Sequence, residues 1–90
     1  MKFNIIVSFF SEMGWQALGK IPNPVSGKIE KNLEMAKQII ELLDILKEKT
    51  NGNLTDEENR FLNTTITDLK LNYVEEISKE KKEDEPKDKI

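Results

Sequence analysis

The twelve-residue segment KEKTNGNLTDEE, from Lys47 to Glu58, constrains the fold of this chain more than any other part of the sequence. Gly52 can adopt the left-handed conformation that ends a helix, and the lysines before it favour a helix C-terminus. Thr55 precedes Glu58 by three residues, which is the spacing of the capping box that starts a helix. The segment therefore predicts two antiparallel helices joined by a short turn.

The residues before this turn show the clearest helical pattern in the chain. Between Ile29 and Leu46, apolar side chains cover about half of the helix surface and charged side chains cover most of the rest. The apolar residues are Ile29, Leu33, Met35, Ala36, Ile39, Ile40, Leu42, Leu43 and Leu46. Because a contact between two helices needs only a narrow stripe, we expect this helix, over about residues 27–50, to touch at least two others. Its predicted N-cap is Ser26 or Gly27.

A third helix is predicted over about residues 56–77. Its apolar residues form a narrow stripe that suits a single hairpin partner. They are Leu62, Ile66, Leu69, Tyr73 and Ile77. The segment 79–90 contains ten charged residues, so we expect a disordered tail outside a single domain of residues 1–78.

The first segment, from Phe3 to Leu18, fits two structures. Its alternating apolar residues are compatible with a strand. A helix over about residues 4–18 is more coherent, because most of its apolar side chains then share one face and the chain offers no second strand for pairing. Pro22 and Pro24 make the residues after it a stiff connector. The expected fold is all-α, with a long antiparallel helical hairpin and an N-terminal amphipathic helix packed across it.

The composition argues against several classes of function. The chain has no cysteine and no histidine, so it lacks disulfides, the commonest zinc ligand and the usual proton shuttle. Its 14 basic and 17 acidic residues give a net charge of -3, which argues against a nucleic-acid surface. We therefore expect no enzyme activity, no cofactor, no metal site and no nucleic-acid partner.

The apolar run from Ile5 to Phe10 imitates a secretory signal. Ser8 interrupts the run, and Glu12 follows it without a small-residue cleavage site. No segment approaches the roughly 20 apolar residues that a membrane span requires. We expect a cytoplasmic protein.

The segment GWQALGKI, from Gly14 to Ile21, matches most of the phosphate-binding loop GxxxxGK[ST]. The motif requires a preceding strand and a final hydroxyl, whereas here the residues continue a helix and Ile21 replaces the hydroxyl. We interpret Gly14 as a glycine that allows helix packing and Gly19 as the glycine that ends the helix.

Trp15 lies off the main apolar face of the first helix, among polar residues. Three interpretations stay open for it. The connector covers it in part, or it contacts another molecule, since tryptophan is frequent in interface hot spots. In the third, the helix lies on a membrane surface with Phe9, Phe10 and Trp15 among the lipid headgroups. Ile5 and Phe9 also lie off the main face. The predicted interaction surface comprises Ile5, Phe9, Trp15, Ile21, Pro22 and Pro24.

These features predict a non-catalytic protein–protein interaction module. The small core, the wide apolar surface of the middle helix and the unplaced Trp15 predict a homodimer that completes a helical bundle, and we expect a further protein partner. The alternative is a peripheral membrane adaptor that uses the first helix. Between Phe3 and Leu18 that helix carries a glutamate and no lysine or arginine, so a membrane surface is the weaker hypothesis.

The sequence GWQALGKIPNPVSGKIEKNLEMAKQIIELLDILKEKTNGNLTDEE, with DLKLNYVEE further on, resembles a family of small bacterial proteins. That family is classed only as a domain of unknown function, number eighteen forty-four. The resemblance covers about Phe3 to Glu76, and its most specific parts are residues 18–24 and 49–55. The family usually has an arginine where this chain has Lys70, and a less interrupted first helix. The resemblance implies an all-helical bacterial cytoplasmic protein and supplies no catalytic or ligand residue.

Overall fold

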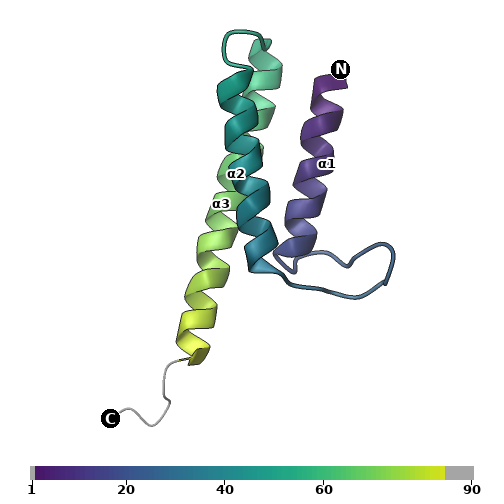
Figure 1. Ribbon diagram of the computed structural model, residues 1–90, viewed down its shortest axis with the longest axis vertical. Coiled ribbons are helices and arrows are strands. Elements are labelled where there is room, and N and C mark those ends of the chain that lie inside the picture. The colour runs from purple at the N-terminus through teal and green to yellow at the C-terminus, as the bar shows by residue number, and fades with distance from the viewer. Residues whose placement is uncertain (1, 85–90) are drawn as a thin grey trace.

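Three α-helices make up the fold, as the sequence predicts. The computed structural model describes residues 2–84, with side chains through Lys81. The helices are α1 (Lys2–Ala17), α2 (Leu33–Lys49) and α3 (Asp56–Asp84), and the described residues contain no strand (Figure 1). The helical interpretation of the first segment is therefore confirmed over the strand.

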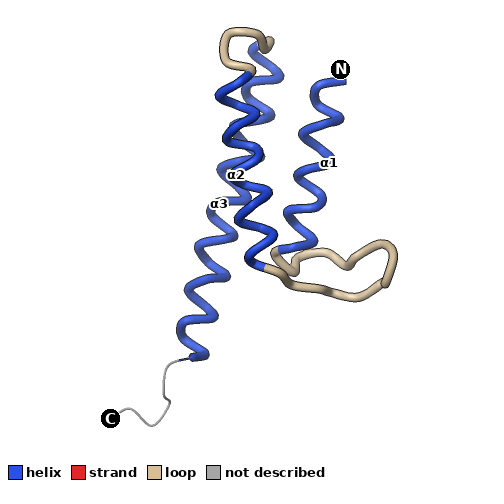
Figure 2. The backbone as a smooth tube through the Cα atoms, viewed as in Figure 1, coloured by secondary structure: helices blue, strands red, loops and turns tan. Residues whose placement is uncertain are grey.

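The helices α2 and α3 lie side by side as an antiparallel hairpin. The N-terminal α1 packs on this hairpin, lies lengthwise along it, and contacts both of its helices (Figures 1 and 2). A long connector joins α1 to α2 at one end of the molecule, and α3 continues past that end. The middle helix thus touches two others, as its wide apolar face predicts.

The turn between α2 and α3 has the predicted chemistry. Gly52 has φ +86°, in the left-handed region. The Thr55 N–H donates to Glu58 Oε1 at 2.9 Å, and the Glu58 N–H donates to Thr55 Oγ1 at 3.1 Å. This reciprocal capping box satisfies two of the free donors at the start of α3. It confirms the predicted start of that helix.

The core is a single apolar cluster to which all three helices contribute. Its buried residues are Val7, Ala17 and Leu18, then Ala36, Ile39, Ile40 and Leu43, then Leu62, Ile66 and Leu69. The partly buried residues packed against it include Trp15 and Tyr73. A chain of this size buries only about 60% of its unfolded surface, so each of these positions matters for stability.

Gly14 lies where α1 packs closely against residues of both α2 and α3. A Cβ atom at this position would be 3.0 Å from Leu69 Cδ2 and 3.5 Å from Ile39 Cγ2. Since Leu69 is fully buried, it has little room to move away. Gly19 has φ +80° just after α1. Both interpretations of these glycines, helix packing for Gly14 and helix ending for Gly19, agree with the structure.

The start of α2 differs from the prediction, which placed it at residue 27. The helix begins at Leu33, and its N-cap is Asn32, whose Oδ1 accepts from the Met35 N–H at 3.1 Å. Asparagine is among the best N-cap residues, so it competes well against an earlier start. The prediction of Ser26 or Gly27 as the cap was wrong.

The residues before α2 form a turn of their own instead of a helix. The side-chain Oδ1 of Asn23 accepts from the Val25 N–H at 2.8 Å, and the Asn23 N–H donates to the Lys28 carbonyl at 2.8 Å. Ser26 Oγ accepts from the Lys28 N–H at 3.2 Å, and Gly27 has φ +72°. These local bonds offer the backbone an alternative to helix.

The end of α3 also differs from the prediction. The helix continues to Asp84, past the expected end at residue 77, so residues 79–84 are not a disordered tail. Lys79 pairs with Glu76 one turn earlier, at 3.3 Å, and lysine and glutamate are good helix formers. The remaining residues of the expected tail, 85–90, lie outside the described residues.

Replacing the observed cap tests where α2 begins. We expect Asn32→Ala to lower the free energy of unfolding by about 1 kcal/mol, because the Met35 N–H loses its acceptor. Ser26→Ala is the matched control and should cost only a few tenths of this, since its hydroxyl serves an exposed turn. Urea unfolding followed by circular dichroism measures both. A larger loss for Ser26→Ala would contradict the observed helix start.

Candidate interaction surface

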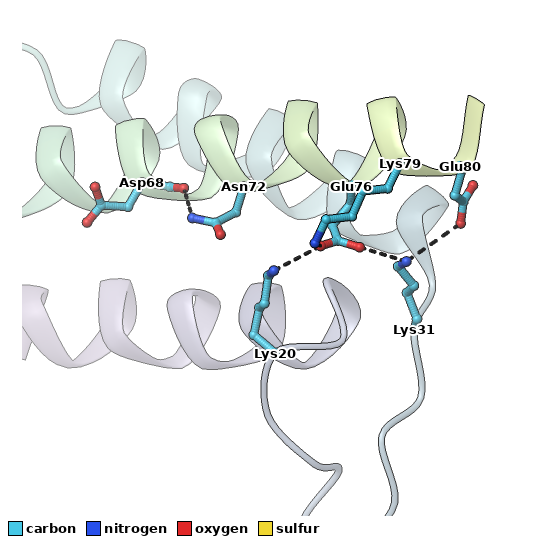
Figure 3. A network of polar contacts seen from close by, with 7 residues as sticks. All are labelled: Lys20, Lys31, Asp68, Asn72, Glu76, Lys79 and Glu80. Atoms are coloured by element: carbon cyan, nitrogen blue, oxygen red, sulfur yellow. Dashed lines mark hydrogen bonds and ion pairs between the residues drawn. The ribbon is translucent and has the colours of Figure 1, made fainter. Parts of the chain in front are cut away.

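A buried acidic side chain lies where the connector meets α3. The Glu76 side chain is 6% exposed, and its Oε2 lies 2.8 Å from Lys20 Nζ. Its Oε1 lies 2.7 Å from Lys31 Nζ, and Lys79 Nζ is 3.3 Å from Oε2. Figure 3 shows the three ammonium groups converging on the one carboxylate. We call these four residues the Glu76 cluster.

The cluster strongly favours the ionised form of Glu76. Hydrogen bonds from Lys20 and then Lys31 are the largest causes, and they lower the pKa of this carboxyl from 4.5 to about 2. Burial opposes them, because desolvation raises the pKa of an acid. The charged hydrogen bonds outweigh that penalty, so the pKa stays low.

The cluster joins the two ends of the connector to α3. Lys20 follows α1 and Lys31 precedes α2, so one carboxylate holds both ends of the intervening loop. A backbone bond from the Asn32 N–H to the Ala17 carbonyl, 2.7 Å long, closes the same loop. Together these contacts set α1 beside α2 at this end of the molecule.

A groove runs between α1 and α2 next to this closed loop. It has a volume of about 300 Å³. Its apolar lining comes from Phe10, Met13 and Ala17 of α1 and from Met35, Ile39 and Leu42 of α2. Polar side chains complete the lining at Gln16, Asn23, Glu30 and Asn32. Such an apolar groove with a polar edge suits an apolar partner rather than a charged small molecule.

The outer surface of α1, opposite the core, is also partly apolar. Phe9 is 65% exposed and Ile5 is 55% exposed. With Ser8 and Glu12 they line a shallow hollow of about 160 Å³. Two large apolar side chains are thus presented to solvent on a helix whose other face is built into the core.

The structure does not bring the residues of the predicted interaction surface together in one place. Ile5 and Phe9 lie together on the outer surface of α1. Trp15 is partly buried and packs against the core. The other three are in the connector, where Ile21 is half-buried and Pro22 and Pro24 are exposed.

The sequence did not lead us to single out two features of the site. The groove residues Met13, Met35 and Leu42 were left out of the predicted interaction surface, although the wide apolar surface of the middle helix was taken to predict a homodimer. Glu76 was not singled out at all. It follows Leu69 by seven residues and therefore continues the buried face of α3, so an acid at that spacing was the available signal.

The described part of the chain shows no candidate metal centre. Residues 2–84 contain no group of three or more acidic, histidine or cysteine side chains placed to hold a metal ion. Among the same residues, no helix has the length and apolar character required to cross a bilayer.

The Glu76 cluster makes stability depend on pH in a defined direction. Because the pKa of Glu76 is lowered on folding, its contribution is complete above about pH 4.5 and is lost as the pH falls toward 2. We expect Glu76→Gln to lower the free energy of unfolding by about 2 kcal/mol at pH 7, and the difference from wild type to shrink toward pH 2. Urea titrations across this range measure the effect.

The exposed neighbour Glu75 provides the control. We expect Glu75→Gln to change the free energy of unfolding by less than about 0.5 kcal/mol at every pH. An equal effect of the two substitutions would show that the cluster contributes nothing specific.

Comparison with known proteins gives one match. Neither the curated proteins nor the solved structures yield a match to this chain. A family model described as "Domain of unknown function (DUF1844)" matches residues 1–75, which include α1, α2, the connector and most of α3. The chain therefore belongs to the DUF1844 family.

Proposed function

We propose that this protein is a non-catalytic interaction module of the cytoplasm that forms a homodimer through the exposed apolar side chains of α1 and α2. The apolar segment that resembles a secretory signal is α1, and it serves as part of the core, which supports the cytoplasmic assignment. The observation that carries the proposal is the apolar surface left uncovered beside the α1–α2 groove.

We call the exposed sides of α1 and α2 together the α1–α2 face. They carry seven large apolar side chains that are each between 45% and 65% exposed. They are Ile5, Ile6, Phe9 and Met13 of α1 and Met35, Leu42 and Ile45 of α2. At about 200 Å² for each large side chain, these fractions leave roughly 700 Å² of apolar surface in water. A standard protein–protein interface buries about 800 Å² on each partner, so the face has the size that a dimer requires.

The groove has the form that an α-helix can occupy. Its two walls are helices that lie side by side, and Met35 and Leu42 are spaced by seven residues, so they present one edge along α2. An amphipathic helix binds such a groove by inserting apolar residues one or two turns apart. A fourth helix in this position would complete a bundle around α1 and α2.

The opposite side of the molecule offers no comparable surface. The exposed large apolar residues of α3 are Phe61, near its start, and Leu71 and Val74, which lie three residues apart on one side of the helix. One such small group is normal on a protein surface. The asymmetry favours the α1–α2 face as the binding surface.

A membrane surface fits this face less well than a protein does. The charged side chains of α1 are Lys2 and Glu12, so the helix carries no excess of positive charge for anionic lipid. Trp15 lies partly buried against the core and not at the exposed edge, where an interfacial anchor would stand.

Two exposed leucines allow a matched test. Leu42 is 49% exposed on the α1–α2 face, and Leu71 is 64% exposed on α3. We expect Leu42→Lys to raise the dimer dissociation constant at least about tenfold, because an ammonium group would be placed in the interface. Leu71→Lys should leave it unchanged. Sedimentation equilibrium measures the constant, and circular dichroism confirms that both variants stay helical.

Other results of the same measurements would contradict the homodimer. A wild-type protein that stays monomeric at tens of micromolar, or equal effects of the two substitutions, would contradict the proposal. A blue shift of Trp15 fluorescence on adding anionic vesicles, with no self-association, would instead support a peripheral membrane adaptor.

A further inference from the structure

We propose that α1 pairs in an antiparallel direction with the α1 of a second copy, through an outer stripe formed by Lys2, Ile5, Phe9 and Glu12. This inference rests on the proposed homodimer and goes further, because it assigns the helix at the centre of the interface and its direction. The stripe lies on the side of α1 away from the core, whose buried residues on this helix are Val7, Gly14 and Ala17.

The spacing of the stripe is that of a contact between two helices. Its members follow one another at intervals of three, four and three residues. This is the repeat that keeps a narrow stripe facing one partner helix. The other face of α1 is already occupied by α2 and α3, and within residues 2–84 Ile5 and Phe9 of the stripe stay exposed.

The hollow on α1 has the geometry of a knobs-into-holes site. Its four lining residues, Ile5, Ser8, Phe9 and Glu12, stand at positions i, i+3, i+4 and i+7. In helix pairs, four residues in this arrangement form the hole that receives one side chain of the facing helix. The exposed Ile5 and Phe9 are themselves side chains of the size that fills such a hole.

The charges of α1 determine the direction of the pair. Lys2 and Glu12 are the charged residues of this helix, and they stand at opposite ends of the stripe. In an antiparallel pair with a two-fold axis near residue 7, Lys2 faces the partner's Glu12 and Ile5 faces the partner's Phe9. A parallel pair would place like charges opposite each other, which is unfavourable.

The helix dipole favours the same direction. Lys2 stands in the first turn of α1, where the partial positive charge of the helix end disfavours a cation. An antiparallel pair brings the partner's Glu12 to that end and offsets the repulsion. Exposed ion pairs contribute little affinity, so these charges select the direction while Ile5 and Phe9 supply the binding.

The antiparallel α1 pair leaves the α1–α2 groove at the edge of the same dimer interface. Met13 belongs both to the lining of the groove and to the flank of α1 next to the stripe. A second α1 laid along the stripe would therefore border the groove on the Met13 side. The size of the α1–α2 face, roughly 700 Å², suits this arrangement on each copy.

Cysteine cross-linking tests the direction directly, because the native chain has no cysteine. We expect the double variant Ile5→Cys/Phe9→Cys to form disulfide-linked dimers under mild oxidation. In the antiparallel pair, the cysteine at position 5 of one copy faces the cysteine at position 9 of its partner. The single variants Ile5→Cys and Phe9→Cys should not cross-link efficiently. Efficient cross-linking by Ile5→Cys alone indicates a parallel pair and overturns the inference.

Charge exchange gives a second test that needs no new covalent bond. Lys2→Glu and Glu12→Lys should each raise the dimer dissociation constant roughly fivefold at low salt, because each creates two like-charge contacts across the two-fold axis. The double variant Lys2→Glu/Glu12→Lys should restore it. In a parallel pair the double variant would give no rescue relative to the single variants, and that result overturns the inference.

The failure of this inference is distinguishable from failure of the proposed function. A wild-type monomer contradicts both. A dimer that Leu42→Lys disrupts, while the double-cysteine variant fails to cross-link and the double charge exchange fails to restore affinity, leaves the interaction module standing and overturns only the antiparallel α1 pair.

Discussion

The ion pairs of the Glu76 carboxylate hold the ends of α1 and α2 against α3. This carboxylate lies buried on α3 and accepts from Lys20 and Lys31, which flank the connector. The ends of α1 and α2 are thereby held on α3 by one group. A buried charge without partners would be strongly unfavourable, and here three ammonium groups compensate it. The side chains of Lys20 and Lys31 are 31% and 36% exposed, so they stay partly in contact with water.

Gly14 and the Glu76 cluster both determine how α1 packs on the hairpin, at different points along the helix. The missing side chain at Gly14 lets α1 approach Leu69 closely, and the Glu76 cluster fixes the helix end beyond it. With α1 held lengthwise along the hairpin, its second apolar side, with Phe9 and Ile5, has no place within the monomer. The exposed surface that we assign to self-association is therefore a consequence of how the core is built.

Local signals explain what the sequence predicts well. The three helices, the turn at Gly52 and the capping box of Thr55 and Glu58 depend on residues close together in the chain, and each agrees with the structure. The outward position of Phe9 also followed from helical periodicity alone. The antiparallel hairpin followed from the shortness of the turn.

The sequence-based predictions were wrong where an alternative local structure competes with a helix, or where contacts between distant residues determine the structure. Ser26 is an acceptable N-cap, but it lies in the turn that the Asn23 side chain stabilises. The helix therefore begins later, with Asn32 as its N-cap. Lys79 continues α3 because Glu76 pairs with it. The Glu76 cluster also joins residues up to 56 positions apart, so no local pattern could identify Lys20 and Lys31 as partners of Glu76. The seven-residue spacing from Leu69 was a signal that Glu76 lies on the buried face of α3, but that spacing does not show what compensates the charge.

Hydrogen exchange at neutral pH, compared between wild type and Glu76→Gln, tests most directly whether the cluster holds α1 on the hairpin. The account predicts faster exchange of the α1 amides and of the Asn32 N–H, which bonds to Ala17, while amides of the α2–α3 turn keep their protection. Unchanged exchange in α1, or equal acceleration throughout the described helices, would contradict it.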